Sequence, residues 1–121
     1  MIDHIGLRTT QFDALVRFYE AALAPLGYTK LHAWADGAGF GRVGATALWL
    51  HASKTKPTGI HIALSGANHA AVDAFYSAAL GAGATDNGKP GLRTDYHANY
   101  YAAFVTDPDG NNLEAVCHVA S

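Results

Sequence analysis

The chain has 121 residues, of which 50% are hydrophobic and 15% are charged. This length suits one domain, and the apolar content is enough for a core, which argues against an intrinsically disordered chain. The net charge is −2 and the few Lys and Arg residues are scattered, so no basic surface for nucleic acid is expected.

The sequence also limits where the protein works. Its first residues lack the basic start and apolar run of a signal peptide. No apolar stretch approaches the roughly 20 residues needed to cross a bilayer. The single cysteine, Cys117, leaves no internal disulfide and suits a reducing compartment. We therefore expect a soluble cytoplasmic protein with no membrane or nucleic-acid partner.

The first half of the chain predicts one strand, one helix and three more strands. Residues 2–8 alternate in character, as a strand does. Thr10 to Asp13 resembles a capping box, with Asp in place of the usual Glu, and an apolar helical face follows it. Pro25 and Gly27 are expected to end this helix. The later strands are predicted at residues 28–35, 39–43 and 46–51.

The second half repeats this plan after a linker at residues 54–58. A strand at 60–65 precedes a helix for which Asn68 is a plausible N-cap and which Gly81 and Gly83 end. Beyond a weak strand near Ala84, residues 85–98 are rich in Gly, Pro and Asn and predict a long loop. The last strands, at 100–106 and 112–118, flank a turn at Asp107-Pro-Asp-Gly110.

Two pairs of similar segments indicate that the chain contains an internal repeat. "DHIGL" returns as "IHIAL" and "FYEAAL" returns as "FYSAAL". His4 and His61 are 57 residues apart, and so are Phe18 and Phe75. We therefore predict an α+β fold in a single domain, residues 1–121, built from two tandem βαβββ modules at about 1–53 and 58–119.

Side-chain alternation places three possible metal ligands on one face of the predicted sheets. Strand residues alternate between faces, so His4, His61, Trp49 and Glu114 oppose the aliphatic positions that pack on the helices. A two-fold repeat brings equivalent positions such as His4 and His61 together. Two imidazoles and one carboxylate form a set that holds a divalent metal and leaves positions open for substrate.

The segments "DHIGL", "GIHIALS" and "DPDGNNLEAV" resemble the vicinal oxygen chelate superfamily over nearly the whole chain, Met1 to about Val119. This superfamily includes glyoxalase I, extradiol dioxygenases, fosfomycin-resistance thiol transferases and bleomycin-binding resistance proteins. The resemblance implies paired βαβββ modules whose mixed sheets curl around a metal site, with helices on the outer face. It places the ligand positions on His4, His61 and Glu114. The implied cofactor is one divalent ion per site, with Fe(II), Mn, Ni, Co and Zn all compatible.

Departures from each subfamily keep several functions open. Glyoxalase I has a fourth ligand where this chain has Trp49, and the thiol transferases share that Trp but have a catalytic Thr where this chain has Gly6. The catalytic Tyr of extradiol dioxygenases falls near Phe104, and bleomycin-binding members lack the metal ligands. We predict a metal-dependent, dioxygenase- or lyase-like enzyme acting on a small molecule. The alternatives are a thiol transferase and a non-catalytic protein that sequesters its ligand.

Other residues are predicted around the metal. Tyr100 and Tyr101 are candidate catalytic residues, since either could bring a phenol to the metal, although packing or a partner interface is an equal alternative. Arg93, in the same segment, could hold an anionic substrate. Alternation also places His51 and His118 on the cavity face, and a rim or core position is the alternative for both. The predicted substrate-binding residues are Trp49, His51, Arg93, Phe104 and His118.

The sequence predicts a homodimer. Half-open sheets leave strand edges exposed, and proteins usually cover or pair such edges. In the resembled superfamily, modules pair within one chain or across two chains. The three ligands would then come from one subunit, or His4 of one subunit would join His61 and Glu114 of the other.

Overall fold

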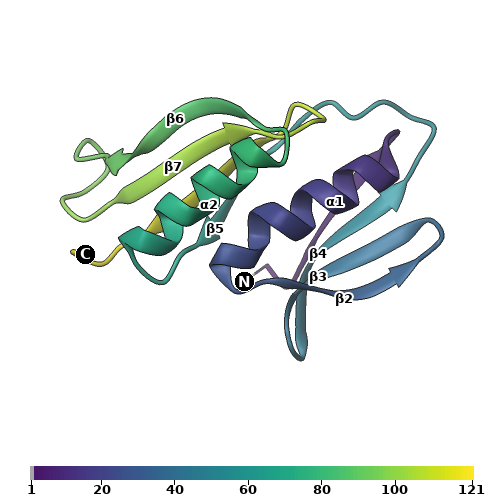
Figure 1. Ribbon diagram of the computed structural model, residues 1–121, viewed down its shortest axis with the longest axis horizontal. Coiled ribbons are helices and arrows are strands. Elements are labelled where there is room, and N and C mark those ends of the chain that lie inside the picture. The colour runs from purple at the N-terminus through teal and green to yellow at the C-terminus, as the bar shows by residue number, and fades with distance from the viewer. Residues whose placement is uncertain (1) are drawn as a thin grey trace.

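The computed structural model describes residues 2–121 and contains two sheets of four strands each, every sheet with its own helix (Figure 1). No helix in the described part of the chain is long and apolar enough to cross a membrane. The elements of the first half are β1 (Ile5–Thr9), α1 (Phe12–Leu23), the short 3-10 helix η1 (Ala24–Leu26), β2 (Thr29–Trp34), β3 (Gly37–Arg42) and β4 (Ala45–Ala52). Those of the second half are β5 (His61–Ser65), α2 (His69–Gly81), β6 (Thr85–Leu92), β7 (Tyr101–Thr106) and β8 (Asn112–Cys117).

The two sheets have the same topology, which confirms the predicted fold class. The strand orders are β1-β4-β3-β2 and β5-β8-β7-β6. In each sheet the first strand pairs with the last in parallel, and the other pairs are antiparallel. Gly6 lies opposite Trp49 in the first sheet, and Ala63 lies opposite Glu114 in the second. Because Gly6 and Ala63 are equivalent in the repeat, Trp49 and Glu114 are equivalent too.

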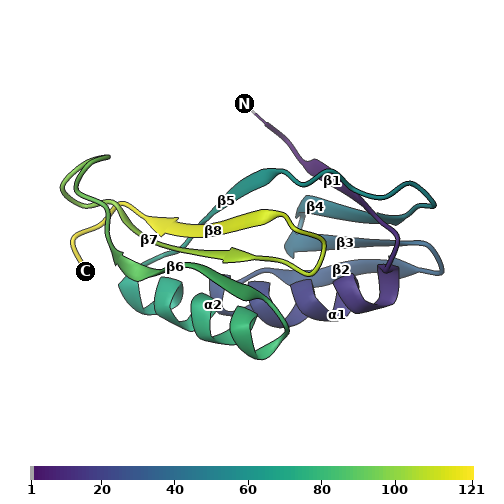
Figure 2. The same cartoon turned by 90° about the horizontal axis from the view of Figure 1, so that it is seen from above.

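The helices and the apolar faces of both sheets form one continuous core. Leu15 and Phe18 of α1 and Val72 and Phe75 of α2 are all at most 1% exposed. The helices lie side by side, along the edge of the molecule opposite β1 and β5 (Figures 1 and 2). Each sheet therefore has one face packed on helices and an opposite face, here called its open face.

The start of α1 differs from the predicted capping box. Its N-cap residue is Gln11, and no side chain caps the helix there. Thr9 Oγ1 accepts a hydrogen bond from the Gln11 backbone N–H at 3.0 Å, while the Gln11 side chain donates to Asp109 Oδ1 at 2.6 Å. The capping-box prediction for Thr10 and Asp13 was therefore wrong, because the polar groups at this end of α1 bind the second half of the chain.

The start of α2 confirms its predicted cap. The Asn68 side chain accepts a hydrogen bond from the Ala71 backbone N–H at 2.9 Å. At the end of the first helical segment, Gly27 has a left-handed φ of 83°, as expected of a residue that closes a helix.

The predicted loop at residues 85–98 was wrong in its first part, where β6 pairs antiparallel with β7. β6 is an edge strand, so it tolerates Pro90, which has no backbone N–H to donate to a neighbouring strand. The pairing register shifts around Gly88, which has a φ of 151°. Composition alone predicted a loop here. These residues are acceptable in a strand because the strand lies at the edge of its sheet, and that position depends on the whole sheet and not on the local sequence.

A buried polar network joins the two halves at the predicted turn. Asp107 Oδ2 accepts hydrogen bonds from Tyr19 Oη at 2.6 Å and from Asn111 Nδ2 at 2.7 Å. Its Oδ1 accepts from the backbone N–H groups of Asp109 and Asn111, both at 2.8 Å. The turn is closed by Gly110, whose left-handed φ of 89° is easiest for glycine. Burial raises the pKa of Tyr19 well above its ordinary value, and Asp107 adds to the effect.

We expect the substitution Tyr19→Phe to lower the free energy of unfolding by about 2 kcal/mol, since it removes a buried hydrogen bond to a charged acceptor. Urea denaturation followed by circular dichroism measures this change. Tyr76→Phe is the matched control, because the Tyr76 hydroxyl donates to Asp86 at the surface. A loss in Tyr19→Phe no larger than that in the control would show that the network does not hold the halves together.

Candidate functional site

Two of the predicted metal ligands meet on the open face of the second sheet. β5 and β8 are parallel neighbours, and His61 Nε2 lies 2.9 Å from Glu114 Oε1. The side chain of Glu114 is only 2% exposed, whereas that of His61 is 54% exposed. The pair therefore has a buried carboxylate and an imidazole that borders solvent.

Tyr100 covers the other oxygen of this carboxylate. Its hydroxyl donates a short hydrogen bond to Glu114 Oε2. Burial, followed by the hydrogen bond and negative charge of Glu114, raises the pKa of Tyr100 to about 12. The phenol therefore keeps its proton at neutral pH and acts as a hydrogen-bond donor.

A pair of histidines fixes the loop that carries Tyr100. The backbone N–H of Asn99 donates to His97 Nδ1 at 3.1 Å, so this nitrogen carries no proton. A neutral His97 then has its proton on Nε2, which lies 2.8 Å from His118 Nδ1 and donates to it. The Tyr100 ring packs edge-on against both imidazoles, with centroids 5.5 Å from His97 and 5.3 Å from His118. His118 thus contacts the loop residue that covers Glu114.

Phe104 and Arg93 extend this cluster. Phe104 lies opposite Glu114 across β7 and β8, and its ring centroid is 6.4 Å from that of His61. The Arg93 guanidinium lies over the Phe104 ring at 5.4 Å. Its N–H groups donate to the backbone carbonyls of Lys89 and Gly91 at 2.7 and 2.9 Å. Arg93 therefore has a fixed place beside the cluster, with part of its hydrogen-bonding capacity used by the backbone.

Tyr101 lies on the other side of the second sheet from this cluster. Its hydroxyl donates to Asp73 Oδ1 of α2 at 2.6 Å, and its ring stacks on His69 at 3.7 Å. The hydrogen bond to Asp73, with burial as the next cause, raises the pKa of Tyr101 to about 12. The two candidate tyrosines are thus separated by the alternation of strand side chains, and only Tyr100 contacts Glu114.

His4 is not brought to His61 and Glu114 within one chain. It precedes β1, is exposed, and pairs through Nδ1 with Asp3 Oδ1 at 2.7 Å. Across residues 2–121, no three His, Cys, Asp or Glu side chains are grouped so that they could hold a metal ion. The single chain therefore contains two of the three predicted ligands in one place and the third elsewhere.

Trp49 and His51 lie on the open face of the first sheet, in an aromatic cluster. The Trp49 ring is stacked with His32 at a centroid distance of 5.3 Å and lies 6.0 Å from the ring of Trp34. Trp34 also meets His51 at 6.5 Å. Sequence reasoning had no argument for His32 or Trp34. The available signal was the glycine at every second position of β3, Gly37-Ala-Gly-Phe-Gly41, which leaves room for large side chains from both neighbours.

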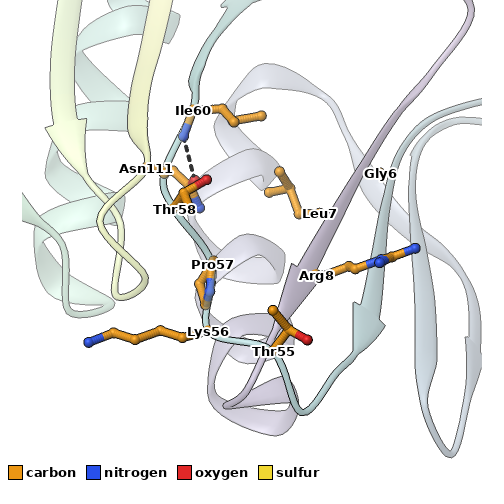
Figure 3. A pocket seen from close by; sticks show the side chains of 10 residues that line it. Gly6, Leu7, Arg8, Thr55, Lys56, Pro57, Thr58, Ile60 and Asn111 are labelled. Atoms are coloured by element: carbon orange, nitrogen blue, oxygen red, sulfur yellow. Dashed lines mark hydrogen bonds between the residues drawn. The ribbon is translucent and has the colours of Figure 1, made fainter.

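A cavity of about 280 Å³ lies between the free edge of β1 and the linker to β5 (Figure 3). Its walls include Gly6, Leu7 and Arg8 on one side and residues 55–60 on the other. Asn111 closes it by accepting a hydrogen bond from the Ile60 N–H at 2.9 Å. This cavity separates the edge strands of the two sheets and contains neither His61 nor Glu114 among its lining residues.

The sequence model of the Glyoxalase/Bleomycin resistance protein/Dioxygenase superfamily matches residues 1–115. The chain belongs to this superfamily. The match spans both sheets up to Ala115, in β8, and so includes the strands that carry His61 and Glu114. No match was found among curated protein sequences.

Solved structures share the fold of this superfamily member. A glyoxalase/bleomycin resistance protein from Albidiferax ferrireducens T118 superposes with a TM-score of 0.78 at 22% identity, covering 93% of this chain and 94% of that one. A glyoxalase/bleomycin resistance protein/dioxygenase family enzyme from Burkholderia phytofirmans PsJN gives 0.75 at 20% identity, with 98% of each chain covered. A glyoxalase-related enzyme from Fulvimarina pelagi gives 0.72 at 16% identity, covering 96% and 86%. At these identities the likeness concerns the fold.

The raised pKa of Tyr100 predicts how Tyr100→Phe changes stability with pH. Because the folded-state pKa of about 12 exceeds the ordinary value of 10.0, the protonated phenol stabilises the folded protein fully below pH 10. We expect the variant to unfold at lower urea concentration than wild type below pH 10, and the difference to shrink between pH 10 and 12. Tyr96→Phe is the control, since Tyr96 is 65% exposed and meets Tyr100 only edge-on. A difference that grows with pH would contradict this account.

Proposed function

We propose that the protein is a metal-dependent enzyme, dioxygenase- or lyase-like, that acts on a small molecule at a site shared by two copies of the chain. His61 and Glu114 of one copy and His4 of the other are the proposed ligands of one divalent ion. The observation that carries the proposal is the contact of 2.9 Å between His61 Nε2 and the buried carboxylate of Glu114.

The residues present fit a divalent ion. A carboxylate that is 2% exposed is costly to bury without a cation, and Glu114 has no Lys or Arg partner among the ion pairs of residues 2–121. Imidazole nitrogen and carboxylate oxygen are ligand types that divalent transition metals accept, and His61 and Glu114 would hold such an ion through these atoms.

The exposure of His4 supports a site made by two chains. Its side chain is 55% exposed, as that of His61 is 54% exposed, so both imidazoles are open to a partner. β1 and β5 are the edge strands of their sheets, and exposed edges favour association. In a two-fold symmetric dimer each chain supplies the same patch, which gives two equivalent sites.

The chain's own residues would bind and orient the substrate. A bound divalent ion would supply Lewis-acid polarisation of substrate oxygens. Tyr100 keeps its proton at neutral pH and donates a hydrogen bond at Glu114 or at a substrate oxygen beside it. Phe104 and the cation of Arg93 form an adjoining wall for an apolar or anionic part of the substrate.

A non-catalytic sequestering protein is the second candidate, and the exposed Trp34 of the first sheet favours it, because an indole offers binding area without a reactive group. Oxygen uptake with catechol-type substrates, and isomerisation or thiol addition with vicinal dicarbonyls and epoxides, test for turnover. Tight binding of a small molecule by metal-free protein, with no turnover in any assay, would replace the enzyme proposal with sequestration.

Elemental analysis of variants tests the ligand set. We expect His4→Ala, His61→Ala and Glu114→Ala each to weaken metal binding by at least about tenfold, since even the loss of a group that only orients a ligand costs that much. His69→Ala is the control, because His69 binds the Val119 carbonyl and stacks on Tyr101. Circular dichroism checks that each variant is folded. Unchanged metal affinity in any of the three removes that residue from the site.

Mixing two variants tests whether the site is shared. We expect His4→Ala and Glu114→Ala proteins, unfolded and refolded together, to regain one intact site per mixed dimer, because one copy then supplies His4 and the other supplies His61 and Glu114. Metal content of the mixture is compared with that of each variant refolded alone. No recovery would indicate a site within one chain, and a monomer by light scattering at micromolar concentration would contradict the dimer.

A further inference from the structure

The open face of the first sheet carries four aromatic rings in two rows. In one row, His32, Gly39 and Trp49 lie side by side across β2, β3 and β4. In the next row Trp34, Gly37 and His51 lie side by side across the same three strands. Here the Trp is on β2 and the His is on β4, the reverse of the first row. We call this set the aromatic platform, and its members are His32, Trp34, Trp49 and His51.

The indoles of the platform lie directly on the backbone of β3. A Cβ atom added at Gly37 would lie 2.2 Å from Cζ2 of Trp34, and one added at Gly39 would lie 2.6 Å from Cζ3 of Trp49. Contacts this short are impossible for a real side chain, so only glycine permits these ring positions. Contact with the backbone of β3 therefore fixes both indoles, inclined at 52° to each other, before any ligand arrives.

The platform borders solvent in the single chain. Trp34 is 50% exposed, and both His32 and His51 are exposed, although large aromatic rings usually bury most of their surface. Gly6, beside Trp49, has no heavy atom within 4 Å of the position of an added Cβ, so the space over this strand is open as well. Gly6 is two residues after His4, so the platform adjoins the proposed metal ligand.

One cation lies at the end of the second row. Arg8 is the register partner of His51, is exposed, and takes part in none of the ion pairs found in residues 2–121. Figure 3 shows its side chain extending away from the linker residues, on the side of β4. Arg8 therefore supplies a positive charge at this end of the row, which attracts an anionic group of a ligand.

We propose that the aromatic platform binds the planar aromatic ring of an anionic substrate, with the ring between the indoles of Trp34 and Trp49, whose planes are inclined at 52° to each other, and the negative group at Arg8. This proposal rests on the proposed function in that the ring belongs to the substrate of the same site. Preorganised indoles favour an aromatic partner, because stacked and edge-on aromatic rings both gain energy beyond the area they bury.

The chain offers a direct readout, since its two tryptophans are both in the platform. Tryptophan emission, excited at 295 nm in metal-free protein, therefore reports on the platform alone. Three probes separate ring from charge: benzoate, cyclohexanecarboxylate and benzylammonium. We expect saturable quenching by benzoate with an affinity about tenfold above that of the other two. An equal response to cyclohexanecarboxylate, or none to benzoate, overturns the proposal.

Two variants test the contact of Trp49 with Gly39 and the charge of Arg8. Gly39→Ala is expected to displace the Trp49 ring and weaken benzoate binding about tenfold, while the metal content of the protein is unchanged. Gly81→Ala is its control, because an added Cβ there meets no heavy atom within 4 Å. Arg8→Gln, a change at the surface that leaves the fold intact, is expected to remove the preference for benzoate over benzylammonium. Retention of both the affinity and the preference in these variants overturns the proposal.

The outcome also separates this proposal from the proposed function. Benzoate binding by wild-type protein that takes up no divalent metal when titrated with it contradicts the metal proposal and supports the platform. Metal binding without a response to benzoate supports the metal proposal and overturns the platform proposal. Dilution of the protein is a further test, with dissociation followed by light scattering. If tryptophan emission changes together with dissociation and does not respond to benzoate, the platform is a contact between copies and its role as a ligand site is overturned.

Discussion

The alternation of side chains along paired parallel strands determines most of this structure. In both sheets the first strand pairs with the last, so the residues between the packed aliphatic ones must all emerge on the open face. Leu113 and Ala115 face the helices and are fully buried in the core, which leaves Glu114 to face the other way. A shift of the register by one residue would exchange these faces, so the core and the candidate site depend on the same pairing.

The sequence predicted what is local or repeated and missed what depends on tertiary context. The offset between His4 and His61 predicted two repeated modules, which the matching topologies of the two sheets confirm. Edge position makes the composition of β6 acceptable in a strand, and contact with the second half replaces the expected cap of α1. The alternation rule drew Glu114 and His61 to one face, but the arrangement of the loop bearing Tyr100 depends on a histidine pair 21 residues apart in sequence.

The two open faces have diverged from one plan into different chemistries. At the position where the second sheet has a buried carboxylate, the first has an indole lying on glycine. The second face accordingly offers a carboxylate, an imidazole and a phenol, and the first offers indole and imidazole rings with the cation of Arg8 at their margin. The proposed dimer would bring one face of each kind together at every site. Such a site would separate orientation of the substrate from the polar groups that act on it, which two identical faces would not do.

A comparison of two buried carboxylates explains why Glu114, and not Asp107, is the proposed metal ligand. Asp107 accepts four hydrogen bonds, two of them from backbone N–H groups of its own turn, and its lone pairs are used within the fold. Within residues 2–121, the hydrogen-bond partners of Glu114 are the Tyr100 hydroxyl and the half-exposed imidazole of His61. A carboxylate with full coordination stabilises a fold, since every partner is fixed by the backbone or core. A carboxylate as buried as Glu114, whose partners are a phenol and a half-exposed imidazole, has fewer fixed partners, and this difference supports its proposed role as a ligand.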